Sequence, residues 1–161
     1  MNLDELFLTT LKDIYFAERQ ILKALPKMVK AAQDPKLKAG FTAHREETEG
    51  QVERLAGVFE IIGKRAQGKT CEAIKGIIEE CDELLEEATE PSAARDAGLI
   101  ACGQAVEHYE MARYGALIAW ANALGKTDAA KLLQANLDQE KKADALLTQV
   151  AGPVNSAAAA A

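Results

Sequence analysis

Residues that favour β-sheet and sharp turns are scarce in this chain. Aromatic residues make up only 5% of the 161 positions, and there are only four prolines. Hydrophobic residues account for 48% of the chain and alanine is abundant, so there is enough apolar material for one globular domain with a real core. Because alanine favours helices and strand-forming aromatic residues are few, the composition predicts an all-α fold.

The chain also lacks an excess of basic residues and a long hydrophobic run. Its formal net charge is −6, and Lys and Arg do not gather on one face, which argues against a nucleic-acid partner. No run of about 18 apolar residues is present to span a membrane. No charged-then-apolar signal segment follows Met1. We therefore expect no membrane association and a cytoplasmic location.

Cysteine is rare as well, and its spacing matches no common module. Cys71, Cys81 and Cys102 are odd in number, lie far apart in the sequence and form no C-x-x-C pair. We interpret them as small buried hydrophobic residues, with redox and metal roles left open.

Apolar residues recur at spacings of three and four along most of the chain, which predicts helices. Breaks are expected at Asp34-Pro35, at Gly63 and at Gly125-Lys126. Long helices are predicted over residues 3–32, 36–62, 91–124 and from 127 to near 152, with a short helix over 71–88. Residues 1–152 would then form a four-helix bundle, and residues 153–161 a flexible, alanine-rich tail.

The lengths of the connections predict how these helices are joined. Tight turns make the first two long helices antiparallel, and likewise the last two. About thirty residues separate the second long helix from the third, enough to cross the full length of a bundle with the short helix on the way. A single long crossover of this kind is the ferritin-like arrangement.

Acidic residues interrupt the apolar stripes of the long helices. Glu18, Glu107, Glu110 and Glu140 lie on the stripes near the helix midpoints, and Glu47 borders the stripe of the second helix. Burying an ionised carboxylate costs several kcal/mol unless it is paired or bound to metal. No Lys or Arg falls on the stripes, so the pattern predicts that these five glutamates bind two Fe or Mn ions.

Four further residues are candidates for additional ligands or for orienting the glutamates. His44 is one turn from Glu47, and Gln51 is one turn further along the same helix. Asp144 is one turn after Glu140, and Tyr114 is one turn after Glu110.

Several stretches together resemble a known family over about residues 3–150. They are His44–Leu55, Arg95-Asp96-Ala97, Val106–Glu110 followed by Tyr114-Gly115, and Leu137–Asp144, and they resemble the YciE/YciF family of ferritin-like proteins. The resemblance implies a bacterial, stress-associated protein whose biochemical activity is not firmly assigned. We also expect a homodimer or a larger homo-oligomer.

The wider di-iron carboxylate pattern maps only partly onto this chain. By resemblance, Glu18 is the lone glutamate of the first helix, and Glu107 and Glu110 form a Glu-x-x-Glu pair. Glu47 and Glu140 match the glutamates of two Glu-x-x-His motifs. The histidines are replaced by Gly50 and Ala143, which puts metal affinity and redox activity in question.

Three functions remain open at this stage. The first is a di-metal oxidase or peroxidase that oxidises Fe(II) or reduces O2 or peroxide. The second is an iron-sequestering protein without turnover. The third is a metal-free structural stress protein that kept the bundle and lost the chemistry.

Overall fold

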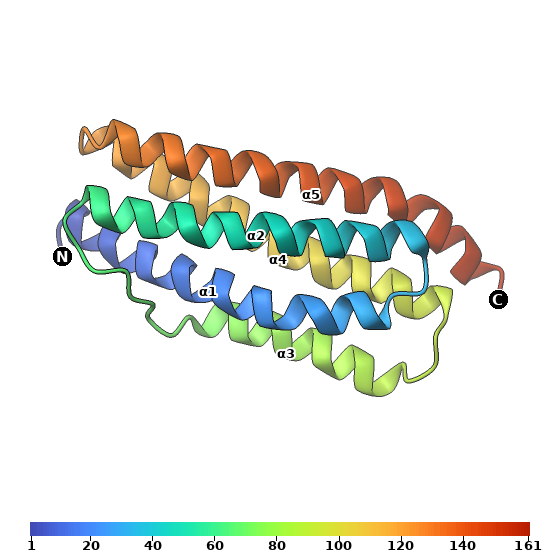
Figure 1. Cartoon of the computed structure of the whole chain (residues 1–161). Coiled ribbons are helices and arrows are strands. Elements are labelled where there is room, and N and C mark those ends of the chain that lie inside the picture. Colours follow the sequence, from blue (N-terminus) through green and yellow to red (C-terminus); the bar gives the residue numbers. More distant parts are fainter.

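The computed structural model describes all residues from 1 to 161 and contains five α-helices and no strand, which confirms the predicted all-α class (Figure 1). The helices are α1 (Leu3–Ala31), α2 (Pro35–Ile61), α3 (Glu72–Glu87), α4 (Ala93–Ala123) and α5 (Thr127–Ala159). No helix is long and apolar enough to cross a membrane.

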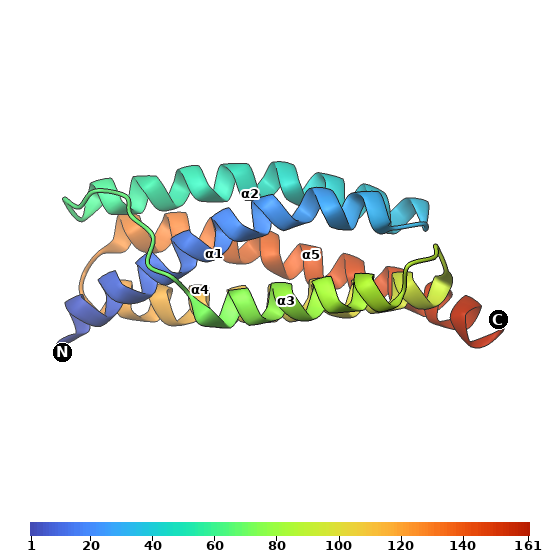
Figure 2. The ribbon, with the colours of Figure 1, turned by 90° about the horizontal axis from the view of Figure 1, so that it is seen from below.

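The long helices α1, α2, α4 and α5 form a bundle in which α1 packs on α2 and α4, and α5 packs on the same two helices. The short α3 lies outside the bundle against α1 and α4 (Figures 1 and 2). Because α2 ends at one end of the bundle and α4 begins at the other, the connection that contains α3 crosses its full length. The predicted long crossover is therefore confirmed.

Local sequence signals account for several of the helix ends. Asn2 and Glu5 form a reciprocal capping box at the start of α1, and the Asp34 side chain caps α2, whose first residue is Pro35. Gly63 and Gly125 follow the ends of α2 and α4 with φ of 66° and 69°, the left-handed region that glycine enters without strain.

The last helix differs from the prediction. We expected α5 to end near Gly152-Pro153, and this boundary is wrong because α5 continues through Pro153 to Ala159. Val150 and Val154 are both about 5% exposed, so the buried stripe continues past the proline. The alanines that follow are strong helix formers and compensate for the backbone hydrogen bond that Pro153 cannot donate.

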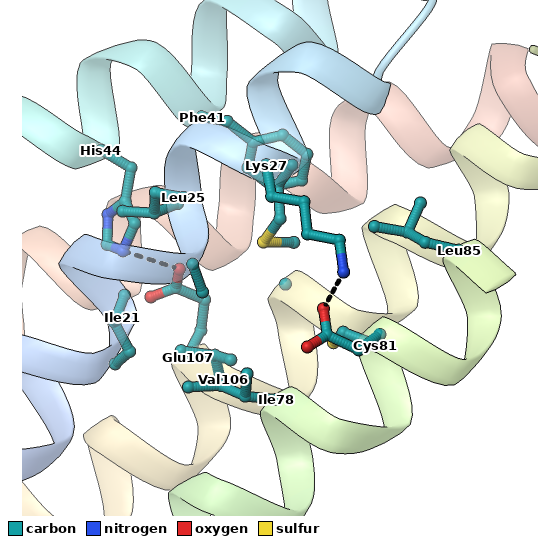
Figure 3. A pocket seen from close by; sticks show the side chains of 14 residues that line it. Ile21, Leu25, Lys27, Phe41, His44, Ile78, Cys81, Leu85, Val106 and Glu107 are labelled. Atoms are coloured by element: carbon teal, nitrogen blue, oxygen red, sulfur yellow. Dashed lines mark hydrogen bonds and ion pairs between the residues drawn. The ribbon is translucent and has the colours of Figure 1, made fainter.

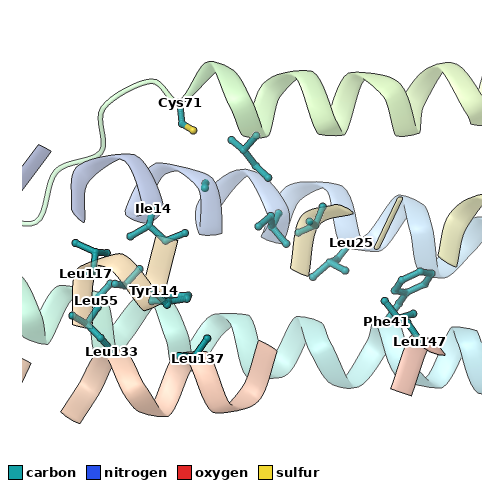
Figure 4. Close-up of a cluster of buried hydrophobic side chains, with 14 of the residues drawn as sticks. Ile14, Leu25, Phe41, Leu55, Cys71, Tyr114, Leu117, Leu133, Leu137 and Leu147 are labelled. Carbon is teal, nitrogen blue, oxygen red and sulfur yellow. The ribbon is translucent and has the colours of Figure 1, made fainter. Parts of the chain in front are cut away.

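The apolar core occupies the bundle on both sides of its middle. Figure 4 shows Ile14, Leu55, Leu117 and Leu133 packed toward one end, and Leu25, Phe41 and Leu147 toward the other. The middle, between these two apolar sections, is where the buried glutamates lie.

Arg95 and Asp96 fasten the end of the crossover to the turn between α1 and α2. The Asp96 carboxylate accepts hydrogen bonds from the backbone N–H groups of Gln33 and Asp34, at 2.9 and 2.7 Å. The Arg95 guanidinium donates to the carbonyl oxygens of Thr89, at 2.9 Å, and Ala31, at 2.6 Å. Both side chains are buried, so a motif first noted for its family resemblance has a structural role here.

We predict that Asp96→Ala lowers the free energy of unfolding by about 3 kcal/mol, because two backbone N–H groups lose a buried, charged acceptor. Asp82→Ala is the matched control. It removes a half-exposed carboxylate that pairs with Lys27 and is expected to change stability by less than about 1 kcal/mol. Chemical denaturation measures both, and equal losses in the two variants would contradict this role of Asp96.

Candidate metal centre

Four buried side chains from three helices meet at the middle of the bundle. His44 comes from α2, Glu107 and Glu110 from α4, and Glu140 from α5. Each offers one nitrogen or oxygen atom, and these atoms all lie within 4.8 Å of one another. Glu107 and Glu110 reach the same point because residues three apart share a helix face.

The His44 imidazole lies beside the Glu107 carboxylate (Figure 3) and near two other carboxylates. Its Nε2 is 3.3 Å from Glu107 Oε1, and its Nδ1 is 3.9 Å from Glu140 Oε2 and 4.0 Å from Glu47 Oε2. Burial lowers the pKa of His44 to about 4. The ring is therefore neutral near pH 7 and can offer a lone pair to a metal ion.

Glu18 from α1 completes the cluster and is held by a chain of hydrogen bonds. Its carboxyl group faces that of Glu110. The Tyr114 hydroxyl donates to Glu18 Oε1 and accepts from the Asn136 side-chain amide at 2.9 Å. The Arg54 guanidinium in turn donates to the Asn136 side-chain oxygen. This chain links the buried Glu18 to a half-buried cation on α2.

Burial raises the pKa values of all four central glutamates. The pKa of Glu18 rises to about 7 and that of Glu107 to about 8. The pKa values of Glu110 and Glu140 rise well above the ordinary range, by burial first and then by repulsion from the neighbouring carboxylates. Without a cation, the cluster therefore keeps protons near neutral pH.

The donor set fits metal ions. Buried atoms of the cluster lack a hydrogen-bond partner: Oε2 of Glu18 and Glu107, both carboxylate oxygens of Glu110 and Glu140, and both ring nitrogens of His44. Such unpaired groups are costly in a protein interior. Four carboxylates balance the charge of two divalent ions, and a site rich in oxygen with one imidazole suits Fe or Mn.

The other residues singled out from the sequence lie around this cluster. The Glu47 side chain is 38% exposed and stands at the rim beside His44. Gln51 is fully buried, and its amide atoms have no partner. Asp144 lies to one side, 3.2 Å from His108 Nε2, and accepts a hydrogen bond from Gln104.

The approach of Arg54 to the centre did not follow from the sequence patterns. We expected no basic side chain in the bundle near the glutamates, but Arg54 reaches inward, and its charge lowers the pKa of Glu18. Its Nη1 lies 3.5 Å from where a Cβ on Gly50 would be, so Arg54 covers the position at which the di-iron pattern has a histidine. A small residue at position 50, four before an arginine, is the signal that could have revealed this arrangement.

Ala143 stands at the other position that lacks a histidine, and it leaves space. It lines a cavity of about 20 Å³ with His44, Glu107 and Leu147. A second cavity, of about 30 Å³, reaches His44 and Glu107 from the α1–α3 side and is lined mainly by apolar residues, including Ile21, Leu25 and Val106 (Figure 3). Each cavity has room for a molecule the size of water.

Comparisons with known proteins identify the family. The profile described as "Domain of unknown function (DUF892)" matches residues 2–160. The Escherichia coli K12 protein YciF is 44% identical over 151 residues, which cover 93% of this chain and 90% of YciF. The chain belongs to this family.

Solved structures support the same assignment. The crystal structure of the E. coli stress protein YciF matches with a TM-score of 0.91 at 42% identity, over 96% of this chain and 98% of that one. YcfI from Rhodopseudomonas palustris, described as a candidate structural protein, matches with a TM-score of 0.89 at 47% identity, over 92% and 94%.

We predict that the metal-free protein loses stability as the pH rises from about 6.5 to 8.5. Unfolded glutamates release their protons near pH 4.5, whereas Glu18 and Glu107 hold theirs up to about pH 7 and 8 when folded. The folded state thus binds more protons in this window, and about 3 kcal/mol of stability is lost across it. His44, whose folded pKa is lowered, acts with the opposite sign, but at lower pH.

Melting curves in the presence of a chelator measure this dependence. Glu107→Gln is the matched variant, because it removes the group expected to release its proton near pH 8, and its melting temperature should fall less. A melting temperature that stays level or rises across this window in the wild-type protein would contradict the raised pKa values.

Proposed function

We propose that this member of the family is a di-metal carboxylate protein of the bacterial stress response, which holds two Fe or Mn ions and uses them to oxidise Fe(II) with O2 or peroxide. The observation that carries the proposal is the buried cluster of His44 and the central glutamates, whose oxygen and nitrogen atoms lack partners. The E. coli relative is called a stress protein, which supports the proposed biological setting.

Proximity divides the ligands between two ions. His44 lies nearest to Glu107 and Glu140, so these three would hold one ion. Glu18 faces Glu110 and would hold the other. Because Glu110 also belongs to the His44 group, its carboxylate would be available to hold either ion. Glu47 and Gln51, at the edge of the cluster, are available as further oxygen ligands.

The protein around the centre would control protons and water. When bound, a pair of redox-active ions would pass electrons from Fe(II) to O2 or peroxide. The Tyr114 hydroxyl holds a proton at Glu18 Oε1, and Asn136 keeps that hydroxyl in place. The neutral His44 ring sits where the two cavities meet the cluster, so a small oxidant could approach Glu107 through mainly apolar surroundings.

A second candidate is a structural stress protein, with or without stored iron and without turnover. The replacement of both histidines of the di-iron pattern by Gly50 and Ala143 favours this alternative. So does the description of the R. palustris relative as a candidate structural protein. In this reading, the acid cluster is kept protonated and contributes little beyond the shape of the core.

We predict that protein purified without chelator and supplied with Mn(II) or anaerobic Fe(II) binds about two ions per chain, by analogy with known bundle sites. Glu107→Gln should lose most of this metal, because Glu107 contacts His44 and lies in the centre of the cluster. Glu46→Gln, which changes an exposed carboxylate on α2, should bind as the wild type does. Elemental analysis after gel filtration gives the stoichiometry.

The same samples separate the functions. Faster removal of peroxide or O2 by the Fe(II)-loaded wild type than by Glu107→Gln would indicate a reactive centre. Metal binding without faster removal would indicate sequestration. Unchanged metal content in Glu107→Gln would place the metal elsewhere and defeat the proposed centre.

A further inference from the structure

The contact between α3 and α4 places two cysteines opposite each other. The two helices run antiparallel (Figure 1) and pack tightly at Gly98, where an added Cβ would lie 2.7 Å from Leu84 Cδ2. In an antiparallel pair of helices, the residue one turn before Leu84 lies opposite the residue one turn after Gly98. These positions are Cys81 and Cys102, and their side chains are within hydrogen-bonding reach of each other.

The two thiols differ in exposure and in the direction of their pKa shifts. Cys81 is only 6% exposed, whereas Cys102 is half-buried. The hydrogen bond from the Cys81 thiol lowers the pKa of Cys102, although burial and the nearby Glu80 carboxylate oppose this effect. Because Cys102 is the more exposed of the two thiols, it is the one that a dissolved oxidant meets first, and its lowered pKa favours the reactive thiolate form.

Cys71 offers an internal comparison. It is buried, and its sulfur lies 2.8 Å from the Tyr109 hydroxyl, not from another thiol.

We propose that Cys81 and Cys102 form a reversible disulfide when the protein meets hydrogen peroxide. The Cys102 sulfur attacks one peroxide oxygen, the O–O bond breaks, and Cys102 becomes a sulfenic acid as the first water leaves. The Cys81 sulfur then attacks the Cys102 sulfur, the S–O bond breaks, and the second water leaves. In sum, two thiols are oxidised to one disulfide and one peroxide is reduced to two waters. A small-molecule thiol reverses the reaction by disulfide exchange.

The link would join the least buried helix to the bundle beside the candidate metal centre. Ile74 and Cys81 are the only buried residues of α3. Cys81 also lines the cavity that leads to His44 and Glu107, together with the half-exposed ion pair of Lys27 and Asp82, at 2.6 Å (Figure 3). The disulfide therefore restrains the wall of this cavity, and α3 amides should exchange with solvent more slowly in the oxidised form.

The test uses the full chain with a metal chelator, so that it is independent of the metal centre. Treatment with hydrogen peroxide should lower the number of free thiols per chain from three to one. Mass spectrometry of the digested, non-reduced protein should show a peptide in which Cys81 is joined to Cys102. Dithiothreitol should restore all three thiols. Cys71→Ser is the matched control and should form the same link.

Two further variants test the order of the steps. Cys81→Ser should stop the reaction at a Cys102 sulfenic acid, which a dimedone probe traps, and Cys102→Ser should leave Cys81 unmodified. Three intact thiols after treatment, a link that involves Cys71, or oxidation of Cys81 in Cys102→Ser would each overturn the proposal. Because none of these readouts depends on bound metal, they stand or fall separately from the proposed centre.

Discussion

The repulsion among four carboxyl groups in a dry bundle is the constraint on which the account of this structure depends. Glu18, Glu107, Glu110 and Glu140 are at most 3% exposed, and the nearest cation, on Arg54, acts on Glu18 from the edge. Burying an apolar residue at any of these positions would cost less free energy than burying an ionised carboxylate. The cluster is stable either as protonated acids or as ligands of cations, and the two states respond oppositely to pH and to metal.

The arrangement of the helices explains how the four glutamates come together in one place. Each glutamate lies near the middle of its helix. Because the crossover through α3 spans the full bundle, the four long helices lie side by side with their middles at the same level. Arg95 and Asp96 fasten the end of this crossover to the α1–α2 turn. The outer helix then covers the apolar cavity next to His44 and carries Cys81 to Cys102. The crossover with its helix α3 therefore contributes to the fold, to the surroundings of the candidate centre and to the thiol pair.

The sequence predicted the helices, their connection and the central glutamates, because apolar periodicity shows directly where a charged residue interrupts a buried face. It was less informative where the outcome depends on contacts between helices. The approach of Arg54 to Asn136 and the pairing of Cys81 with Cys102 depend on the packing of side chains more than twenty positions apart. Pro153 suggested a helix end, but the burial of Val154 outweighed that local signal. His44 was visible on the buried face of its helix, yet its contact with Glu107 required the packed structure.

The most direct measurement is the melting temperature of the wild type and of the Glu18→Gln, Glu140→Gln double variant, each with and without Mn(II) or anaerobic Fe(II). A metal that binds only the folded bundle should raise the wild-type melting temperature by mass action. The double variant should melt higher than the wild type without metal, because repulsion is removed, and should gain nothing when metal is added. A wild-type melting temperature that ignores metal would contradict the di-metal account and leave a structural protein with protonated core acids.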